Sequence, residues 1–309
     1  MPGRASPVSI ILLLILGSVW GLTLSIAKIA SGAGVPPLGY AFWQGAGAGL
    51  VLLAICAATG RLPPVDRPHL RYYVFMGACG LGIPNAISFT VITQVPVGAM
   101  AVVINLVPLI VYTLSLILGL ERFAALRFTG VVVGLAGALS LVLPEASLPD
   151  PAMTGWLVLG MATPTLYAIG AIGGARWRPA GTPSLTLASG MLLAAGLVLL
   201  PVVLATGTFY VPRIGLGGSP PPGTGDAALA AQIGASSMMF VLYFELLRRS
   251  GPLIASLVGY LVTLSGILWG MAIFGERHSA WLWLAVALIF AGLGLVNFAG
   301  RRSRPSTAP

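Results

Sequence analysis

Apolar runs long enough to cross a lipid bilayer recur from one end of the sequence to the other. A helix needs about 20 apolar residues to cross the roughly 30 Å hydrocarbon layer, and such runs occur here about every 30 residues. Only 7% of the residues are charged, whereas an ordinary soluble domain has about 25%. So few charges cannot cover a water-facing surface. The sequence therefore predicts an all-α integral membrane protein.

The apolar runs predict ten transmembrane helices. The first run is about 23 residues long, longer than the 7 to 15 residues of a cleavable signal peptide core, so we expect it to remain as the first span. The predicted spans are Val8–Ala30, Pro37–Thr59, Leu70–Thr93, Val97–Leu120, Ala125–Leu143, Met153–Gly174, Ser184–Thr206, Asp226–Leu247, Pro252–Phe274 and Ala280–Gly300.

Basic residues predict the orientation of these spans, because basic loops stay on the cytoplasmic side. With a cytoplasmic N-terminus, thirteen fall inside: Arg4, Arg61, Arg67, Arg71, Arg122, Arg127, Arg176, Arg178, Arg248, Arg249, Arg301, Arg302 and Arg304. Three fall outside, namely Lys28, Arg213 and Arg277. This bias predicts that the N- and C-termini are both cytoplasmic.

An internal repeat divides the ten spans into two halves. The segments 106–137 and 261–292 align without gaps, and the alignment places Glu121-Arg122 opposite Glu276-Arg277. Because each half has five spans, an odd number, the second copy must enter the membrane from the opposite face. We therefore expect two inverted five-helix repeats, residues 1–145 and 146–309, in one membrane domain. Inverted repeats of this kind are typical of transporters.

Three passages carry a resemblance to a known family. They are Trp20-Gly21 with Lys28 at the end of the first span, the stretch from Pro108 to Gly137 with its Gly-Leu-Glu-Arg, and Phe-Gly-Glu-Arg from Phe274. The chain resembles the EamA-type members of the drug/metabolite transporter superfamily over essentially its whole length. Thr263 departs from the family pattern, since it stands where the second repeat usually has a proline. The resemblance implies a ten-helix exporter of small metabolites or amino acids in a bacterial inner membrane.

Polar residues in the middle of spans are candidates for contact with a substrate, because a polar group that faces lipid is costly. The substrate-binding candidates are Trp20, Lys28, Asn85, Asn105, Tyr112, Tyr167, Ser237, Tyr243, Tyr260 and Trp269. Gln44, Ser88 and Ser236 belong to the same polar mid-span set. For each residue the alternative role is a hydrogen bond between helices.

Three prolines also lie near mid-span: Pro84, Pro108 and Pro164. Each removes a backbone hydrogen bond, so we expect it to kink its helix, with gating or lining of a cavity as a possible role.

Charged residues limit the mechanism. Glu121 and Glu276 each lie beside an arginine at a helix end, so we expect local ion pairs there. Lys28 near the outer end of the first span either extends to the interface or anchors a substrate carboxylate. Because no Asp, Glu or His falls in the middle third of a span, we expect weak or absent proton coupling through a buried acid.

These features predict a secondary transporter, an exporter of small neutral or zwitterionic metabolites such as amino acids. It would work by alternating access at a midplane cavity lined by the first, third, fourth, sixth, eighth and ninth spans. The expected partners are a small-molecule substrate and the lipid bilayer, with no nucleic acid, no cofactor and no metal, in a monomer or homodimer.

Two alternatives remain open. A nucleotide-sugar or sugar-phosphate carrier of the same superfamily would need more than one basic residue at mid-membrane. A non-transporting membrane scaffold is the other. We do not expect an enzyme, because both histidines, His69 and His278, lie in loops.

Overall fold

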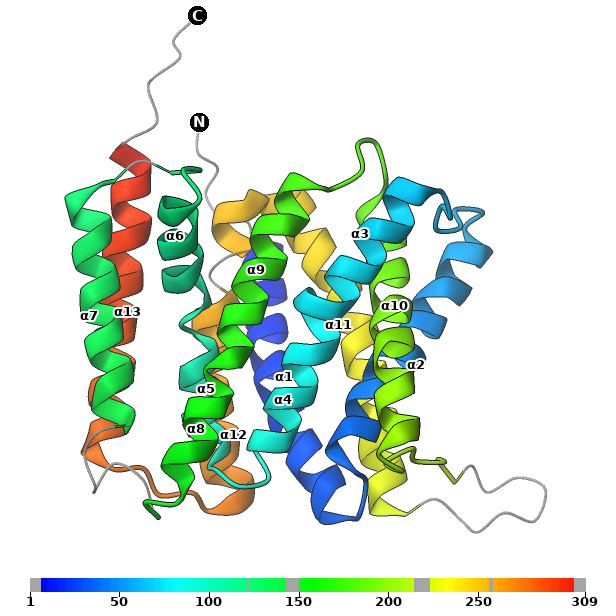
Figure 1. Cartoon of the computed structure of the whole chain (residues 1–309), viewed down its shortest axis with the longest axis horizontal. Coiled ribbons are helices and arrows are strands. Elements are labelled where there is room, and N and C mark those ends of the chain that lie inside the picture. The colour runs from blue at the N-terminus through cyan, green and yellow to red at the C-terminus, as the bar shows by residue number, and fades with distance from the viewer. Residues whose placement is uncertain (1–6, 122, 143–149, 214–222, 256–257, 303–309) are drawn as a thin grey trace, which may run out of the picture.

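The computed structural model describes residues 7–121, 123–142, 150–213, 223–255 and 258–302, and every regular element within them is a helix (Figure 1). The helices are α1 (Pro7–Gly32), α2 (Pro37–Ala58), α3 (Arg67–Gly77), the π-helix η1 (Ala78–Gly82), α4 (Ile83–Val91), α5 (Val97–Ile104), α6 (Val107–Ile117), α7 (Ala125–Val142), α8 (Met153–Gly160), α9 (Ala162–Arg176), α10 (Ser184–Ala205), α11 (Thr224–Ala255), α12 (Val258–Phe274) and α13 (Ala280–Arg302).

The described helices group into ten apolar segments. Seven segments of the described chain are long and apolar enough to cross a membrane, and three shorter apolar helices, within α7, α12 and α13, complete the set. Three of the long segments consist of several helices: α3 with η1 and α4, α5 with α6, and α8 with α9. The prediction of an all-α membrane protein is confirmed.

The two halves run through the molecule in opposite directions. In Figure 1 the chain enters α1 from the upper side and leaves α13 on the same side. The α6–α7 connection with Glu121 is at the upper end, whereas the α12–α13 connection with Glu276 is at the lower end. This is the arrangement of an inverted repeat. The assignment of the upper side to the cytoplasm stays a prediction from the basic residues.

Helices from the two halves pack against one another in matching pairs. The most extensive contacts are those of α7 with α13, of α2 with α10, and of α1 with α11 and α12. The contacts of α9, which begins the second half together with α8, mirror those of α1, since α9 packs on η1, α4 and α6. The halves therefore form one body with a shared interior.

Glycines permit the closest of these contacts. A Cβ atom on Gly21 of α1 would lie 2.1 Å from the Ser265 hydroxyl of α12, and one on Gly45 of α2 would lie 2.8 Å from the backbone nitrogen of Gly196 in α10. No side chain fits at these distances. Small residues let membrane helices approach closely where lipid provides no hydrophobic drive for association.

The boundary between the eighth and ninth spans differs from the sequence prediction. We expected a break before Pro252, but α11 continues to Ala255 and α12 begins at Val258. A proline removes one backbone hydrogen bond from a helix, and this helix continues through it.

Candidate substrate cavity

A cavity of 530 Å³ lies between the helices of the two halves. Its lining residues are Trp20, Thr23, Leu24, Gln44, Met76, Gly80, Leu81, Asn85, Ser88, Phe89, Ile104, Asn105, Val107, Pro108, Tyr167, Met191, Ser236, Phe240, Tyr243, Val258, Gly259, Val262 and Thr263. All of them are uncharged. They come from both halves of the chain, from Trp20 of α1 to Thr263 of α12.

Interruptions of the helices shape the wall of the cavity. Gly80 and Leu81 belong to η1, the π-helical turn between α3 and α4. Ile104, Asn105 and Val107 lie at the interruption between α5 and α6. Insertions and breaks of this kind redirect backbone groups and are frequent at functional sites.

Each mid-span proline lies at such an interruption. Pro84 and Pro108 are in the first turn of α4 and α6, and Pro164 is the third residue of α9. Pro108 lines the cavity, whereas the Pro84 carbonyl accepts a hydrogen bond from Thr163 at 3.3 Å. A role in gating stays a prediction for all three.

A hydrogen-bonded chain of uncharged side chains crosses the cavity wall and joins both halves. Gln44 donates to the Ser236 hydroxyl at 3.2 Å and accepts from the Asn85 amide at 2.7 Å. Tyr167 donates its hydroxyl proton to the Asn85 side-chain oxygen. These residues come from α2, α4, α9 and α11, so a movement of one half against the other must change this chain.

Three aromatic rings form a cluster at another part of the wall. The centroid of the Trp20 ring lies 6.0 Å from that of Phe240 and 5.8 Å from that of Tyr243, both with edge-to-face geometry. The cluster provides a large apolar and polarisable surface beside the polar chain.

Five of the ten substrate-binding candidates line the cavity: Trp20, Asn85, Asn105, Tyr167 and Tyr243. The other five do not. The Tyr112 hydroxyl accepts a hydrogen bond from the backbone N–H of Ala124 at 3.2 Å, and Ser237 donates to a carbonyl of its own helix. Substrate contact by any of the ten stays a prediction.

Two aromatic candidates pack between helices. The Tyr260 ring lies edge-on to Phe290, with centroids 5.0 Å apart. The Trp269 indole donates to the Ser18 carbonyl at 3.1 Å. Both positions fit the alternative role, a contact between helices.

Gln44, Ser88 and Ser236 line the cavity, although they were not selected as candidates. Their mid-span polarity was the available signal. Gln44 on α2 and Met191 on α10 also show that the second and seventh spans reach the cavity, in addition to the six that we expected.

Lys28, the last of the five, lies at the lower end of α1 and forms an ion pair with Glu276, with 3.3 Å between Nζ and Oε1. The Glu276 carboxylate also accepts hydrogen bonds from the backbone N–H groups of Val97 at 2.7 Å and Gly98 at 3.2 Å. It therefore caps the start of α5. The expected local pair of Glu276 with Arg277 is wrong, because the folded halves bring Lys28 to this carboxylate instead.

Apolar packing reinforces this end of the molecule. Tyr40, Ile92 and Val95, near the lower ends of α2 and α4, are at most 2% exposed and belong to the largest buried cluster. Packed side chains and the Lys28–Glu276 pair therefore lie together at this end of the molecule.

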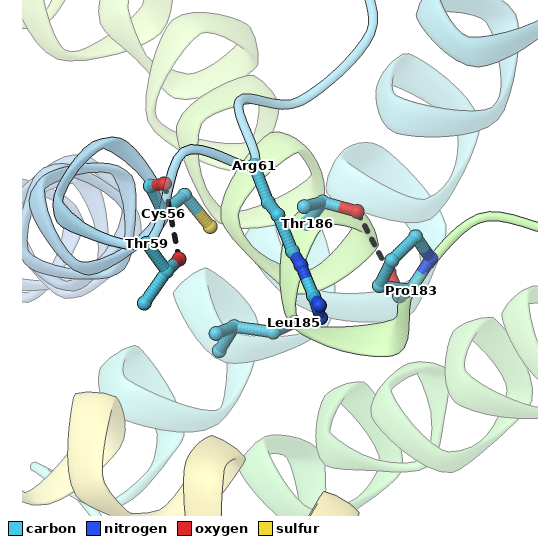
Figure 2. Close-up of a pocket in the computed structure, with 6 residues that line it drawn as sticks. All are labelled: Cys56, Thr59, Arg61, Pro183, Leu185 and Thr186. Carbon is cyan, nitrogen blue, oxygen red and sulfur yellow. Dashed lines mark hydrogen bonds between the residues drawn. The ribbon is translucent and has the colours of Figure 1, made fainter.

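A second pocket, of 350 Å³, lies between the end of α2 and the start of α10 (Figure 2). The hydroxyls of Thr59 and Thr186 are bonded to backbone carbonyls, and the Arg61 side chain extends toward the start of α10. This pocket is at the end of the helices and takes residues from only two of them. Its position does not suit a route across the membrane.

A ten-segment membrane protein with opposed halves around an uncharged central cavity has the architecture of a secondary transporter. Comparison with known proteins gives the family. The model of the EamA-like transporter family matches residues 8–143 and 154–298. The chain belongs to this family, within the drug/metabolite transporters, as its sequence passages indicated.

Individual relatives are similar over nearly the whole chain. The protein PecM of Dickeya dadantii is 30% identical over 283 residues, which cover 90% of this chain and 89% of PecM. The inner membrane transporter YedA of Escherichia coli K12 is 29% identical over 287 residues, 90% of this chain and 87% of YedA. The prediction of a multi-pass inner-membrane protein is confirmed.

One crystal structure shows the same fold. It aligns with a TM-score of 0.58 at 22% identity and covers 96% of this chain and 98% of the other.

Proposed function

We propose that this protein exports small neutral or zwitterionic metabolites, such as amino acids, by alternating access at the central cavity. The observation that carries the proposal is the cavity lining, which is uncharged and drawn from both halves. A volume of 530 Å³ is within the roughly 300–1,000 Å³ range of sites for small molecules.

The polarity of the lining supports a solute without net charge. A net charge buried without a partner is strongly unfavourable, and no lining residue supplies a counter-charge. A sugar phosphate or nucleotide sugar would need basic groups, and Lys28, the basic residue nearest in sequence to the lining, is paired with Glu276. The lining therefore favours amino acids and similar metabolites over the phosphorylated alternative.

The relation of the two halves supports alternating access. A pair of charged side chains, Lys28 and Glu276, crosses between the halves at the lower end, and we propose that this is the closed end. Two similar halves that exchange conformations would open the lower end and close the upper one. Because no lining residue is an acid, we propose that a buried carboxylate does not couple transport to protons.

Transport by the purified full chain in proteoliposomes tests this function. We expect release of one or more amino acids or neutral metabolites faster than from empty liposomes, and a large loss of rate in Asn85→Leu, which breaks the hydrogen-bonded chain at two bonds. Ala57→Ser, on the exposed surface of α2, is the control and should keep the rate. A broad panel in which no solute moves faster than in empty liposomes would contradict the proposal.

A further inference from the structure

The pocket between the end of α2 and the start of α10 contains a cation that no described carboxylate neutralises. Arg61 lines this pocket, and Figure 2 shows its side chain extending toward Leu185. The Arg61 guanidinium forms no ion pair with any described residue, and no lining residue is an acid. A guanidinium has five N–H donors, so the pocket offers an anion several hydrogen bonds.

The turn that ends α2 fixes the position of Arg61. Gly60 has a φ of 67°, a conformation that favours glycine, and its N–H donates to the Ala57 carbonyl at 3.0 Å. The Arg61 N–H donates to the Cys56 carbonyl at 2.8 Å. This pair of bonds is the Schellman motif of helix ends. Because Cys56 also lines the pocket, the turn brings Arg61 back over the pocket wall.

A second guanidinium is held at the start of α10. Arg178 Nη2 donates to the Ser184 hydroxyl at 2.6 Å, and Ser184 lies between two residues that line the pocket. The connection before α10 is itself tied to α3, because His69 Nε2 lies 2.8 Å from the Thr182 hydroxyl. The two walls of the pocket are therefore joined, and each contributes one arginine.

The surroundings of the pocket are strongly basic. Residues 59–71 and 176–186 contain a single acid, Asp66, and five arginines: Arg61, Arg67, Arg71, Arg176 and Arg178. Asp66 is already bonded to the backbone N–H and the ring of His69, at 3.0 and 2.5 Å. None of the five arginines forms an ion pair with a described residue. The resulting positive potential favours an anionic ligand.

An apolar face of α2 continues from the pocket toward the middle of the membrane. Val51, Ile55 and Thr59 are four residues apart and so lie on one face of the helix. Thr59 lines the pocket, whereas Val51 and Ile55 are exposed large apolar residues. A ligand with a phosphate and an acyl chain matches both parts, and a free phosphate matches only the first. Basic pockets between transmembrane helices are typical sites for anionic lipid head groups.

We propose that this pocket binds the head group of an anionic phospholipid. The phosphate accepts hydrogen bonds from the Arg61 guanidinium, Arg178 adds positive charge beside it, and an acyl chain lies along Val51 and Ile55. The pocket volume of 350 Å³ is within the roughly 300–1,000 Å³ range of sites for small molecules. Because α2 and α10 belong to different halves, the bound lipid joins the halves at this end. The inference does not depend on the proposed transport function.

Binding of short-chain lipids to the purified full chain in a nonionic detergent tests the inference. The probes are dioctanoyl phosphatidylglycerol, which is anionic, dioctanoyl phosphatidylcholine, which has no net charge, and inorganic phosphate. We expect phosphatidylglycerol to bind and to raise the unfolding temperature, and phosphatidylcholine to bind at least about five-fold more weakly. Inorganic phosphate at the same concentration should neither raise the unfolding temperature nor displace phosphatidylglycerol.

Arg61→Gln separates lipid recognition from folding. It removes the guanidinium but keeps the backbone N–H of the Schellman motif, so phosphatidylglycerol should bind about ten-fold more weakly. Without lipid the unfolding temperature should not change, because the guanidinium has no ion-pair partner there. The matched control is Arg71→Gln, which removes an exposed arginine of α3 outside the pocket lining and should weaken binding by less than about two-fold.

Arg61→Lys is the second variant if Arg61→Gln does not fold. It keeps the charge but loses the fork of donors, so phosphatidylglycerol should bind about three-fold more weakly. Wild-type affinity in a folded Arg61 variant, or equal binding of the two lipids, would overturn the inference. An equal loss in Arg71→Gln would show attraction to the basic surface as a whole, and displacement by inorganic phosphate would show a site for the free anion. Either result would also overturn it.

Discussion

Glu276 and Glu121 occupy equivalent positions in the two halves, yet their surroundings are opposite. The Glu276 side chain is 8% exposed, pairs with Lys28 and caps the start of α5. The Glu121 side chain is 48% exposed and pairs with Arg127, six residues away, at 2.8 Å. Glu121 is therefore paired within its own half, with Arg127, whereas its expected neighbour Arg122 lies outside the described residues.

The two ends of the molecule are therefore held together by different contacts. At the lower end of Figure 1, a carboxylate of the second half holds together two helices of the first half. At the upper end, the equivalent carboxylate bonds within its own half. In an inverted repeat, an asymmetry of this kind is expected when one end is closed and the other is open. The closed end would be the one where Glu276 joins two helices of the other half.

The largest effect should come from Glu276→Ala compared with Glu121→Ala. Removal of the buried Glu276 carboxylate leaves Lys28 and the first N–H groups of α5 without this partner, which should lower the free energy of unfolding by about 2–3 kcal/mol. Glu121→Ala should change it by less than about 0.5 kcal/mol, because the Glu121 side chain is half exposed and solvent screens its charge. Denaturant titration of both variants measures the difference, and equal losses would mean that the two ends are held alike.

A smaller effect is expected from Lys28→Met. The Lys28 side chain is 26% exposed, so solvent screens the pair, and Glu276 keeps its two backbone donors. We expect a loss of about 1 kcal/mol and a coupling energy of similar size in a double-mutant cycle with Glu276→Gln. The matched cycle of Arg127→Met with Glu121→Gln should give a weaker coupling. Additive effects of the two substitutions would show that the Lys28–Glu276 ion pair does not contribute to stability.

The smallest expected effect is a pH dependence of the protein's stability, caused by His278 beside Glu276. The His278 side chain is 2% exposed, with Nε2 3.5 Å from the Glu276 carboxylate. Burial holds the pKa of His278 below its ordinary value of 6.5, against the opposing charge of Glu276, which itself pairs with Lys28. Between the two values the unfolded chain binds more protons than the folded chain, so stability should fall as the pH drops below about 6.5.

His278→Gln isolates this contribution. The variant cannot be protonated at this position, so the part of the stability loss between pH 6.5 and the lowered pKa should disappear. We expect the change to stay below about 1 kcal/mol. Unfolding temperatures measured from pH 5 to pH 8 provide the comparison, and identical slopes in wild type and variant would exclude His278 as the source.

The depth of a side chain in the membrane could be predicted from the sequence. The direction in which the side chain points around its helix axis could not. Asn85 and Tyr112 are both polar and near mid-span, yet Asn85 lines the cavity and Tyr112 bonds to the start of α7. Helices that are apolar on every side give no periodic signal for the face toward the interior. For this reason Tyr260 on α12 was selected as a candidate, whereas Gln44 on α2, which lines the cavity, was not.

The Lys28–Glu276 pair could not be predicted from the sequence, for another reason. The two residues are 248 positions apart and meet only because the folded halves interlock. The span count depends on hydropathy, and the opposed halves depend on the Glu-Arg pair that is repeated at 121 and 276. Both features can be read directly from the sequence. A contact between halves depends on how they pack, and no local pattern encodes it.

The accessibility of the cavity from each side of the membrane shows whether the end with Lys28 and Glu276 is closed. A Ser236→Cys variant, with Cys56 and Cys79 replaced by alanine, places one thiol in the cavity. A membrane-impermeant thiol reagent should modify it from the side on which the chain enters α1. From the Glu276 side the reagent should modify it more slowly, and Glu276→Ala should increase that rate. Modification of the single-thiol protein from the Glu276 side alone, or equally from both sides, would contradict an end closed by Lys28 and Glu276.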